Sequence, residues 1–163
     1  MKLIYTFIFL FISTFSTVNY ANQFYLGTDI SHLKFDQIEF EAVNVKTILA
    51  GYTFKNWSIE GSYNISNTDN KFYGGDQKVN MYHLYSVYRS QGALYYKIKL
   101  GITNERYKFY DNDGKLKLDD VHSGVAGGIG LGYRYGQFNV EFEYSRLGLS
   151  LEMLGIGIRY NFN

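Results

Sequence analysis

The chain ends in Gly155-Ile156-Gly157-Ile158-Arg159-Tyr160-Asn161-Phe162-Asn163. Large apolar side chains alternate there with Gly, Arg and Asn, and an aromatic residue stands almost at the terminus. Because side chains on a β-strand point alternately to opposite faces, this stretch predicts a strand with one apolar face and one small or polar face. Such a strand suits a wall between lipid and a polar interior, and it is typical of the closing strand of a membrane β-barrel.

The same period of two continues through the chain after Ala21, in eight segments of about ten residues, which is the length that crosses a bilayer at a tilt. The clearest segment is 94–103, where an apolar series alternates with Tyr95, Lys97, Lys99, Gly101 and Thr103. The other predicted strands are 23–32, 45–54, 57–66, 79–89, 124–135, 138–145 and the C-terminal segment. Segment 79–89 has aromatic residues on both faces, so its facing is left open.

The connections alternate between short and long. Tight hairpin turns are predicted at 55–56, 90–92 and 136–137. Longer polar connections are predicted at 33–44, 67–78 and 104–122, with a brief one at 146–150. This pattern predicts an all-β fold, an eight-stranded antiparallel up-and-down transmembrane β-barrel with both termini at the end of the short turns.

The N-terminus has the features of an export signal. Lys2 precedes the apolar run 3–15, which is shorter than the roughly 20 residues of a spanning helix, and small and polar residues lead to Ala21. We expect residues 1–21 to be a cleaved signal peptide and residues 22–163 to form the barrel domain. An uncleaved anchor is the alternative.

Composition narrows the classes of partner. Without residues 1–21 the chain loses only Lys2 among its charged residues, which leaves 16 − 1 = 15 basic and 15 acidic side chains. A neutral balance argues against nucleic acid as a partner. The chain has no Cys, and its three histidines, His32, His83 and His122, lack the spacing of a metal motif. We therefore expect no cofactor and no metal site.

Several segments resemble a known family. They are FYLGTDIS (24–31), GYTFKNWSIEGSY (51–63), LYYKIKLGI (94–102), GGIGLGYRYGQFNVEFEYS (127–145) and GIGIRYNF (155–162). Together they resemble the OmpA-like, porin-like family of small outer-membrane β-barrel proteins. The resemblance implies a location in the outer membrane of a Gram-negative bacterium and contact with its lipid and lipopolysaccharide.

The resemblance also implies an assembly signal. Gly157, Tyr160 and Phe162 occupy the GxxYxF positions that the family's barrel-assembly machinery recognises. The family usually ends at the aromatic residue, whereas Asn163 follows Phe162 here.

A soluble lipocalin-like carrier is the main alternative architecture, because alternation alone does not say which face points outward. Export and the terminal strand favour the membrane. Aromatic residues near the short turns also favour it, since they predict an interfacial girdle. They are Tyr52, Phe54, Trp57, Tyr133, Tyr135, Phe138, Tyr160 and Phe162.

The barrel interior is predicted to hold a charge cluster. A two-residue turn at 136–137 places Gly132 opposite Glu141 and Gly130 opposite Glu143, and these glycines leave room for the carboxylates. Counting from the short turns brings further charges to a similar height, so the predicted lumen cluster is Glu60, Lys97, Lys99, Glu141, Glu143 and Arg159. An ion path is one interpretation. A polar core that holds the barrel in register is favoured, because an eight-stranded lumen is filled by its side chains.

Two motifs suggest chemistry only weakly. His122-Ser123 suggests the Ser/His pair of a lipid-modifying enzyme. Neighbouring strand residues point to opposite faces, however, so these two side chains cannot form a hydrogen-bonded dyad. Asp111-Asn112-Asp113-Gly114 suggests calcium, although Lys115 occupies a ligand position of the EF-hand pattern, and a solvated turn is favoured.

The predicted role depends on the long connections. Arg106, Tyr107, Lys108, Phe109 and Tyr110 form a candidate surface-contact loop for lipopolysaccharide phosphates or host surface ligands. We expect a non-enzymatic protein with a structural or surface-interaction role in adhesion, host contact or envelope integrity. A small-solute porin is the alternative, and a lipid-modifying barrel enzyme is less favoured.

Overall fold

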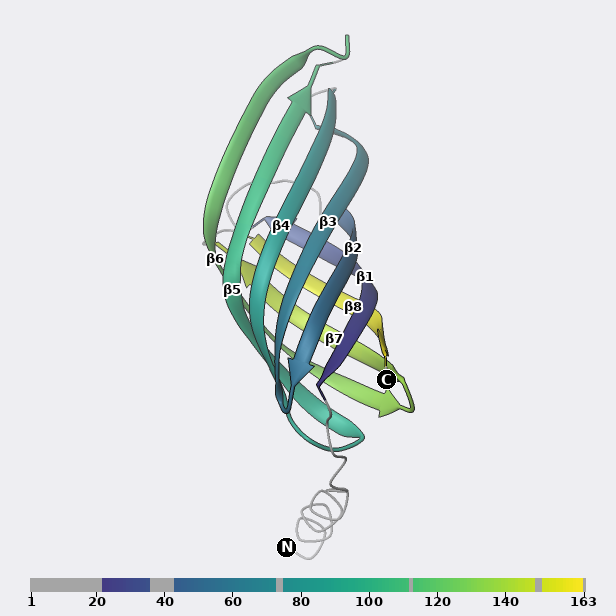
Figure 1. The fold of residues 1–163 in the computed structure, drawn as a ribbon. Helices are drawn as coiled ribbons and strands as arrows, with labels where there is room; N and C mark the ends of the chain where they lie inside the picture. The colour runs from purple at the N-terminus through teal and green to yellow at the C-terminus, as the bar shows by residue number, and fades with distance from the viewer. Residues whose placement is uncertain (1–21, 36–42, 73–74, 112, 149–150, 163) are drawn as a thin grey trace, which may run out of the picture.

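A computed structural model describes residues 22–35, 43–72, 75–111, 113–148 and 151–162. They form a closed barrel of eight strands in chain order, and every neighbouring pair is antiparallel (Figure 1). The strands are β1 (Gln23–Phe35), β2 (Val43–Phe54), β3 (Trp57–Phe72), β4 (Gly75–Arg89), β5 (Leu94–Tyr110), β6 (Leu116–Tyr135), β7 (Phe138–Leu147) and β8 (Leu151–Asn161). The predicted barrel is confirmed. No helix among the described residues is long and apolar enough to cross a membrane.

The strand register sets the width of the barrel. One path of paired residues leads from β1 round the barrel and back to β1, through Tyr25, Gly51, Glu60, Tyr85, Gly101, Ala126, Leu147, Leu151 and Phe35. The path returns 35 − 25 = 10 residues further along β1. With eight strands, this stagger corresponds to a tilt of roughly 40° from the barrel axis. The interior of such a barrel is narrow enough for side chains to fill it.

The faces of the strands alternate as predicted. On β7 the burial alternates strictly, with Glu141, Glu143 and Ser145 inside and Val140 and Phe142 outside. The exposed apolar residues of all eight strands therefore form one belt around the outside. On β4, whose facing the sequence left open, Val79, Met81, His83, Tyr85, Val87 and Arg89 are buried inside.

Aromatic side chains gather where the apolar belt meets the short turns. Rings of neighbouring strands touch there, with centroids 5.2 Å apart for Trp57 and Tyr88 and 5.2 Å apart for Phe138 and Tyr160. The two-residue turns at 55–56 and 136–137 are present, while the predicted 90–92 turn extends to Ala93. This girdle is typical of a membrane interface.

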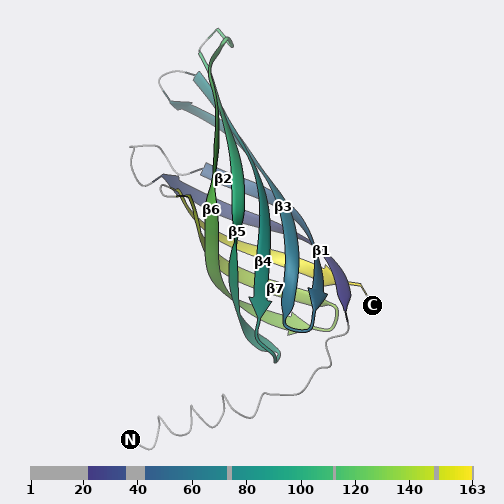
Figure 2. The same cartoon turned by 60° about the vertical axis from the view of Figure 1, so that its left-hand side comes forward.

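The strands β3 to β6 extend furthest beyond their predicted ranges. β5 has 17 residues and β6 has 20, whereas β7 has 10 and β8 has 11. Most of the predicted connections 67–78 and 104–122 is therefore strand, and β3 to β6 rise past the other strands as a raised sheet (Figure 2). The prediction of long loops was wrong there. Beyond the membrane both faces of a strand can be polar, so the alternation of apolar and polar residues that predicts a strand is lost.

The raised part of β6 has a partly unpaired edge. β6 pairs with β5 from Leu116 onward, but it pairs with β7 only from Ala126. At the start of this edge, Gly148 N donates to Val125 O at 2.9 Å. Further along, Val121 N donates to the Asp120 side chain at 2.9 Å.

The lipid-facing belt predicts how charged substitutions act. Ile129 lies midway along the outward series of β6, and Ile102 is the last apolar outward residue of β5 before Asn104. We expect Ile129→Arg to destabilise the barrel in lipid vesicles by about 2–4 kcal/mol and Ile102→Arg by about 1 kcal/mol or less, because the cost depends on depth. Urea unfolding in vesicles measures both. Equal, small effects at both positions would contradict a membrane belt.

Candidate functional site

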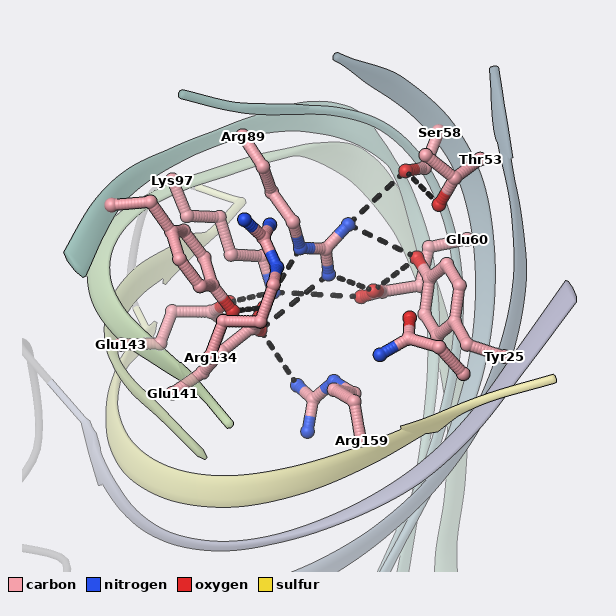
Figure 3. Close-up of polar contacts among 12 residues, drawn as sticks. Tyr25, Thr53, Ser58, Glu60, Arg89, Lys97, Arg134, Glu141, Glu143 and Arg159 are labelled. Carbon is pink, nitrogen blue, oxygen red and sulfur yellow. Dashed lines mark hydrogen bonds and ion pairs between the residues drawn. The ribbon is translucent and has the colours of Figure 1, made fainter. Parts of the chain in front are cut away.

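Glu141 on β7 is the centre of the lumen cluster (Figure 3). Its Oε1 lies 2.7 Å from Arg89 Nε, and its Oε2 lies 2.9 Å from Lys97 Nζ and 3.3 Å from Arg159 Nη2. Tyr95 Oη donates a further hydrogen bond to Oε1 at 2.7 Å. One fully buried carboxylate thus links cations from β4, β5 and β8 across the barrel.

Glu60 on β3 extends the cluster to the opposite wall. Its Oε2 lies 3.0 Å from Arg89 Nη2 and accepts a hydrogen bond from Tyr25 Oη at 2.8 Å. Arg89 Nη1 donates to Tyr25 Oη and to Ser58 Oγ, each at 3.2 Å. Arg89 therefore connects both carboxylates, and Figure 3 shows its guanidinium between them.

Glu143 and Asp29 complete the cluster further from the short turns. Lys97 Nζ lies 2.6 Å from Glu143 Oε2, and Lys99 also pairs with Glu143. On β1, Asp29 pairs with Arg159 through both carboxylate oxygens. Four acidic and four basic side chains thus balance one another in an interior where an unpaired charge would cost several kcal/mol.

Glycines on the lumen wall make space for this cluster. The register confirms that Gly132 lies opposite Glu141 and Gly130 opposite Glu143. A Cβ at Gly132 would overlap the ring of Tyr95. The small residues of β6 therefore let the long side chains of its neighbours lie flat across the lumen.

All six predicted members of the lumen cluster belong to one connected network of ion pairs. Sequence reasoning missed four partners, which are Tyr25, Asp29, Arg89 and Tyr95. Arg89 was missed because 79–89 could not be phased, although its position just before a short turn places it at the level of Glu141. Asp29 alternates with the apolar residues of 23–32, but its contact with Arg159 depends on the register between β1 and β8, which no local pattern reveals.

Side chains fill the lumen at two levels. The charge cluster fills the part nearer the short turns, and an apolar layer fills the part nearer the raised sheet. That layer includes Leu33, Val45, Val79, Met81, Leu147 and Leu151, each at most 4% exposed. Beside Asp29, Glu143 and Arg159 lies a cavity of roughly the size of one water molecule. Side chains therefore occupy the interior at both levels.

The two weaker motifs have other contacts. His122 Nε2 lies 3.0 Å from Asp120 Oδ2, and Ser123 Oγ accepts a hydrogen bond from Asn104 at 2.9 Å, so His122 and Ser123 are not hydrogen-bonded to each other. Asp111 Oδ1 accepts hydrogen bonds from the backbone of Asp113 and Lys115, as in a closed turn. The Lys115 contact is the main reason why the pKa of Asp111 is lowered. Asn112 lies outside the described residues.

Residues 106–110, predicted as a loop, belong to β5 in the raised sheet. Arg106 on the outer face makes two hydrogen bonds to Asp119, at 2.7 and 2.5 Å, and the pKa of Asp119 is lowered chiefly by this contact. On the inner face, Tyr107 Oη donates to Glu105 at 2.5 Å. Lys78 lies over the ring of Tyr110 at 5.5 Å. Lys108 is half-buried, and the side chain of Phe109 lies outside the described residues.

Among the described residues, no group of three His, Cys, Asp or Glu side chains is arranged to hold a metal ion.

The model of the family described as outer membrane protein beta-barrel domain matches residues 7–163. The chain belongs to this outer-membrane β-barrel family. The protein therefore resides in the bacterial outer membrane, with its apolar belt in the lipid.

Solved structures with the same fold include three small barrels. Neisserial surface protein A has a TM-score of 0.67 and 16% identity over 85% of this chain and 97% of its own. Ail of Yersinia pestis, crystallised with the heparin analogue sucrose octasulfate, has a TM-score of 0.62 and 19% identity over 86% and 97%. The N-terminal barrel domain of Pseudomonas aeruginosa OprF has a TM-score of 0.66 and 15% identity over 87% and 100%. Comparison with curated protein sequences finds no match.

The central position of Glu141 predicts a large stability effect. Glu141→Gln leaves three buried cations without their shared carboxylate, and breaking a buried pair costs about 3–5 kcal/mol. We expect a loss of this size in urea unfolding of the refolded barrel. Asp119→Asn, which removes an exposed ion pair, is the matched control and should leave the unfolding midpoint nearly unchanged.

The same cluster predicts the electrical behaviour of the barrel. Because the lumen is closed, Glu141→Gln and Glu143→Gln should disturb stability more than conductance. Planar bilayer recordings compare the native protein with both variants. Native channels that vanish in these variants would overturn the structural interpretation of the cluster.

Proposed function

We propose that the protein is a membrane-anchored surface-contact protein whose raised sheet binds ligands outside the cell. The observation that carries this proposal is the unequal height of the barrel wall. β3 to β6 continue beyond the apolar belt as a paired sheet, whereas β7 and β8 are much shorter. A rigid sheet held above the membrane presents side chains in constant positions, which favours recognition.

The filled lumen supports the same proposal. A porin needs a continuous polar path, whereas here the Glu141 cluster and the apolar layer occupy the interior. A lipid-modifying enzyme needs a nucleophile and a base in contact, and His122 and Ser123 have separate partners. A non-catalytic role in adhesion, host contact or envelope integrity fits these contacts best.

Acidic glycans are the ligand class that we propose for the raised sheet. Arg106 is neutralised by Asp119 and Lys117 lies 3.3 Å from Asp111, whereas Lys115 at the exposed tip makes its hydrogen bond through the backbone only. Lys78 and Lys108 are directly paired on β4 and β5, where Lys78 is exposed and Lys108 is half-buried. Three lysines thus supply positive charge to an outside ligand. Ail, a barrel of the same fold, was crystallised with a sulfated heparin analogue, which supports this class.

The route to the membrane follows from the two ends of the chain. We propose that residues 1–21 act as a cleaved signal peptide, ahead of a barrel domain over 22–163; residues 1–21 lie outside the described residues. We also propose that the barrel-assembly machinery recognises β8 through Gly157, Tyr160 and Phe162. In the folded barrel, the rings of Tyr160 and Phe162 are in contact, with centroids 4.9 Å apart.

Shortening one hairpin tests the proposed role. Glu105 and His122 are paired, so replacing residues 106–121 with Asn-Gly joins β5 to β6 by a two-residue turn. We expect this variant to fold, with heat-modifiable gel migration, and to lose host-cell binding while solute uptake stays unchanged. Unchanged binding together with lost uptake would favour the porin.

Charge removal on the raised sheet tests the ligand class. Lys78→Gln, Lys108→Gln and Lys115→Gln together should reduce retention on immobilised heparin and lower the salt concentration needed for elution. The control is Lys55→Gln, which removes an exposed charge in the 55–56 turn at the other end of the barrel. Equal loss of retention in both variants would indicate a general charge effect and contradict a glycan site on the sheet.

A further inference from the structure

The upper edge of the apolar belt differs between the two sides of the barrel. Below the raised sheet, the outward residues at this edge are neutral. Asn104 Nδ2 donates to Ser123 Oγ at 2.9 Å, and Asn80 accepts a hydrogen bond from Tyr63 Oη at 3.3 Å. These amides and hydroxyls satisfy one another, so this side offers little positive charge at the membrane surface.

On β1 and β2 the same edge is basic. Lys46 is exposed, and its register neighbours are two isoleucines, Ile30 on β1 and Ile65 on β3, which are 63% and 41% exposed. The backbone of Lys46 therefore lies at the upper margin of the apolar belt. A lysine in this position extends its aliphatic stem along the apolar surface and places its charge among the lipid headgroups.

Polar groups continue above Lys46. His32 and Asn44 are directly paired across β1 and β2, and His32 Nδ1 lies 3.2 Å from Asn44 Oδ1. Lys34 is the next outward residue on β1 and is exposed, and its register neighbour on β8 is Glu152. One lysine thus lies below the His32–Asn44 pair and one above it, all on the lipid-facing surface. We call these four residues the β1–β2 basic patch.

We propose that the β1–β2 basic patch binds the phosphate group of an outer-leaflet lipid of the lipid A type. The height of the patch matches the headgroup layer, because it begins where the apolar belt ends. Two ammonium groups with a neighbouring imidazole and amide supply the charge and the hydrogen-bond donors that a phosphate accepts. Near an anionic membrane surface each basic side chain adds to binding.

A lipid ligand fits this patch better than a soluble anion. Ile30, Ile48 and Ile65 lie beside or below Lys46 on the outer face, so acyl chains contact the protein directly beneath the phosphate. The raised sheet lacks this combination, since Arg106 is paired with Asp119 and lies two residues beyond the neutral Asn104. The proposal is independent of the glycan-binding role, which uses different lysines.

The test measures binding of lipid A by the full-length refolded protein in detergent micelles. Native mass spectrometry compares bis-phosphorylated lipid A, dephosphorylated lipid A and phosphatidylethanolamine. We expect Lys34→Gln with Lys46→Gln to weaken binding of bis-phosphorylated lipid A roughly tenfold or more. The matched control, Lys78→Gln with Lys108→Gln on the raised sheet, should stay within about twofold of the native protein. Heat-modifiable migration confirms that each variant is folded.

Three results would overturn the proposal. The first is equal lipid A binding by the native protein and the β1–β2 variant, or equal loss in the control. The second is complete displacement of lipid A by excess inorganic phosphate, which indicates a small-anion site. The third is a lowered unfolding midpoint in the β1–β2 variant with unchanged lipid A binding. In that case the lysines stabilise the fold itself, as Lys34 would through Glu152, its register neighbour on β8.

Discussion

The contact of Glu141 with Arg89, Lys97 and Arg159 is the interaction on which the closed barrel depends. In a soluble protein the apolar core drives folding, but here the apolar belt faces lipid and charged side chains fill the lumen nearer the short turns. Charges in such an interior must be paired, and their pairs are directional. The cluster therefore specifies the strand register, which an apolar core would not do. Each carboxylate pairs only with the cations that this register brings to it.

The distribution of small and large side chains in the lumen follows from the need to pair these charges in a narrow interior. A stagger of ten residues over eight strands gives a lumen too narrow for large side chains on every strand, so β6 contributes glycines where Tyr95 and Glu143 cross. Outside, the belt ends where the headgroups begin, and the strands beyond it are free to vary in length. Architecture and recognition thus occupy separate parts of the same strands.

Sequence reasoning reached the architecture because period-two alternation and two-residue turns determine facing and register together. The 136–137 turn alone placed the glycines of β6 against Glu141 and Glu143. The pattern is ambiguous on β4, where Tyr82 and Tyr85 occupy opposite faces, and it therefore did not place Arg89 in the lumen. It also ended β5 and β6 too early, because beyond the lipid a strand needs no apolar face and residues such as Arg106 and Asp119 resemble a solvated loop. Contacts across the barrel, such as Asp29 with Arg159, depend on the stagger, which no local pattern reveals.

The partly unpaired edge of β6 affects how the protein meets its neighbours in the membrane. An unpaired strand edge is a template for another chain, and outer-membrane proteins lie close together in their bilayer. Here Asp120 accepts the backbone N–H of Val121 from within the same strand, and Gly148 covers the carbonyl of Val125. Each contact withdraws one group from the row that a neighbouring strand would need. The sheet can thus stand above a densely populated membrane with less tendency to join the sheet of the next molecule.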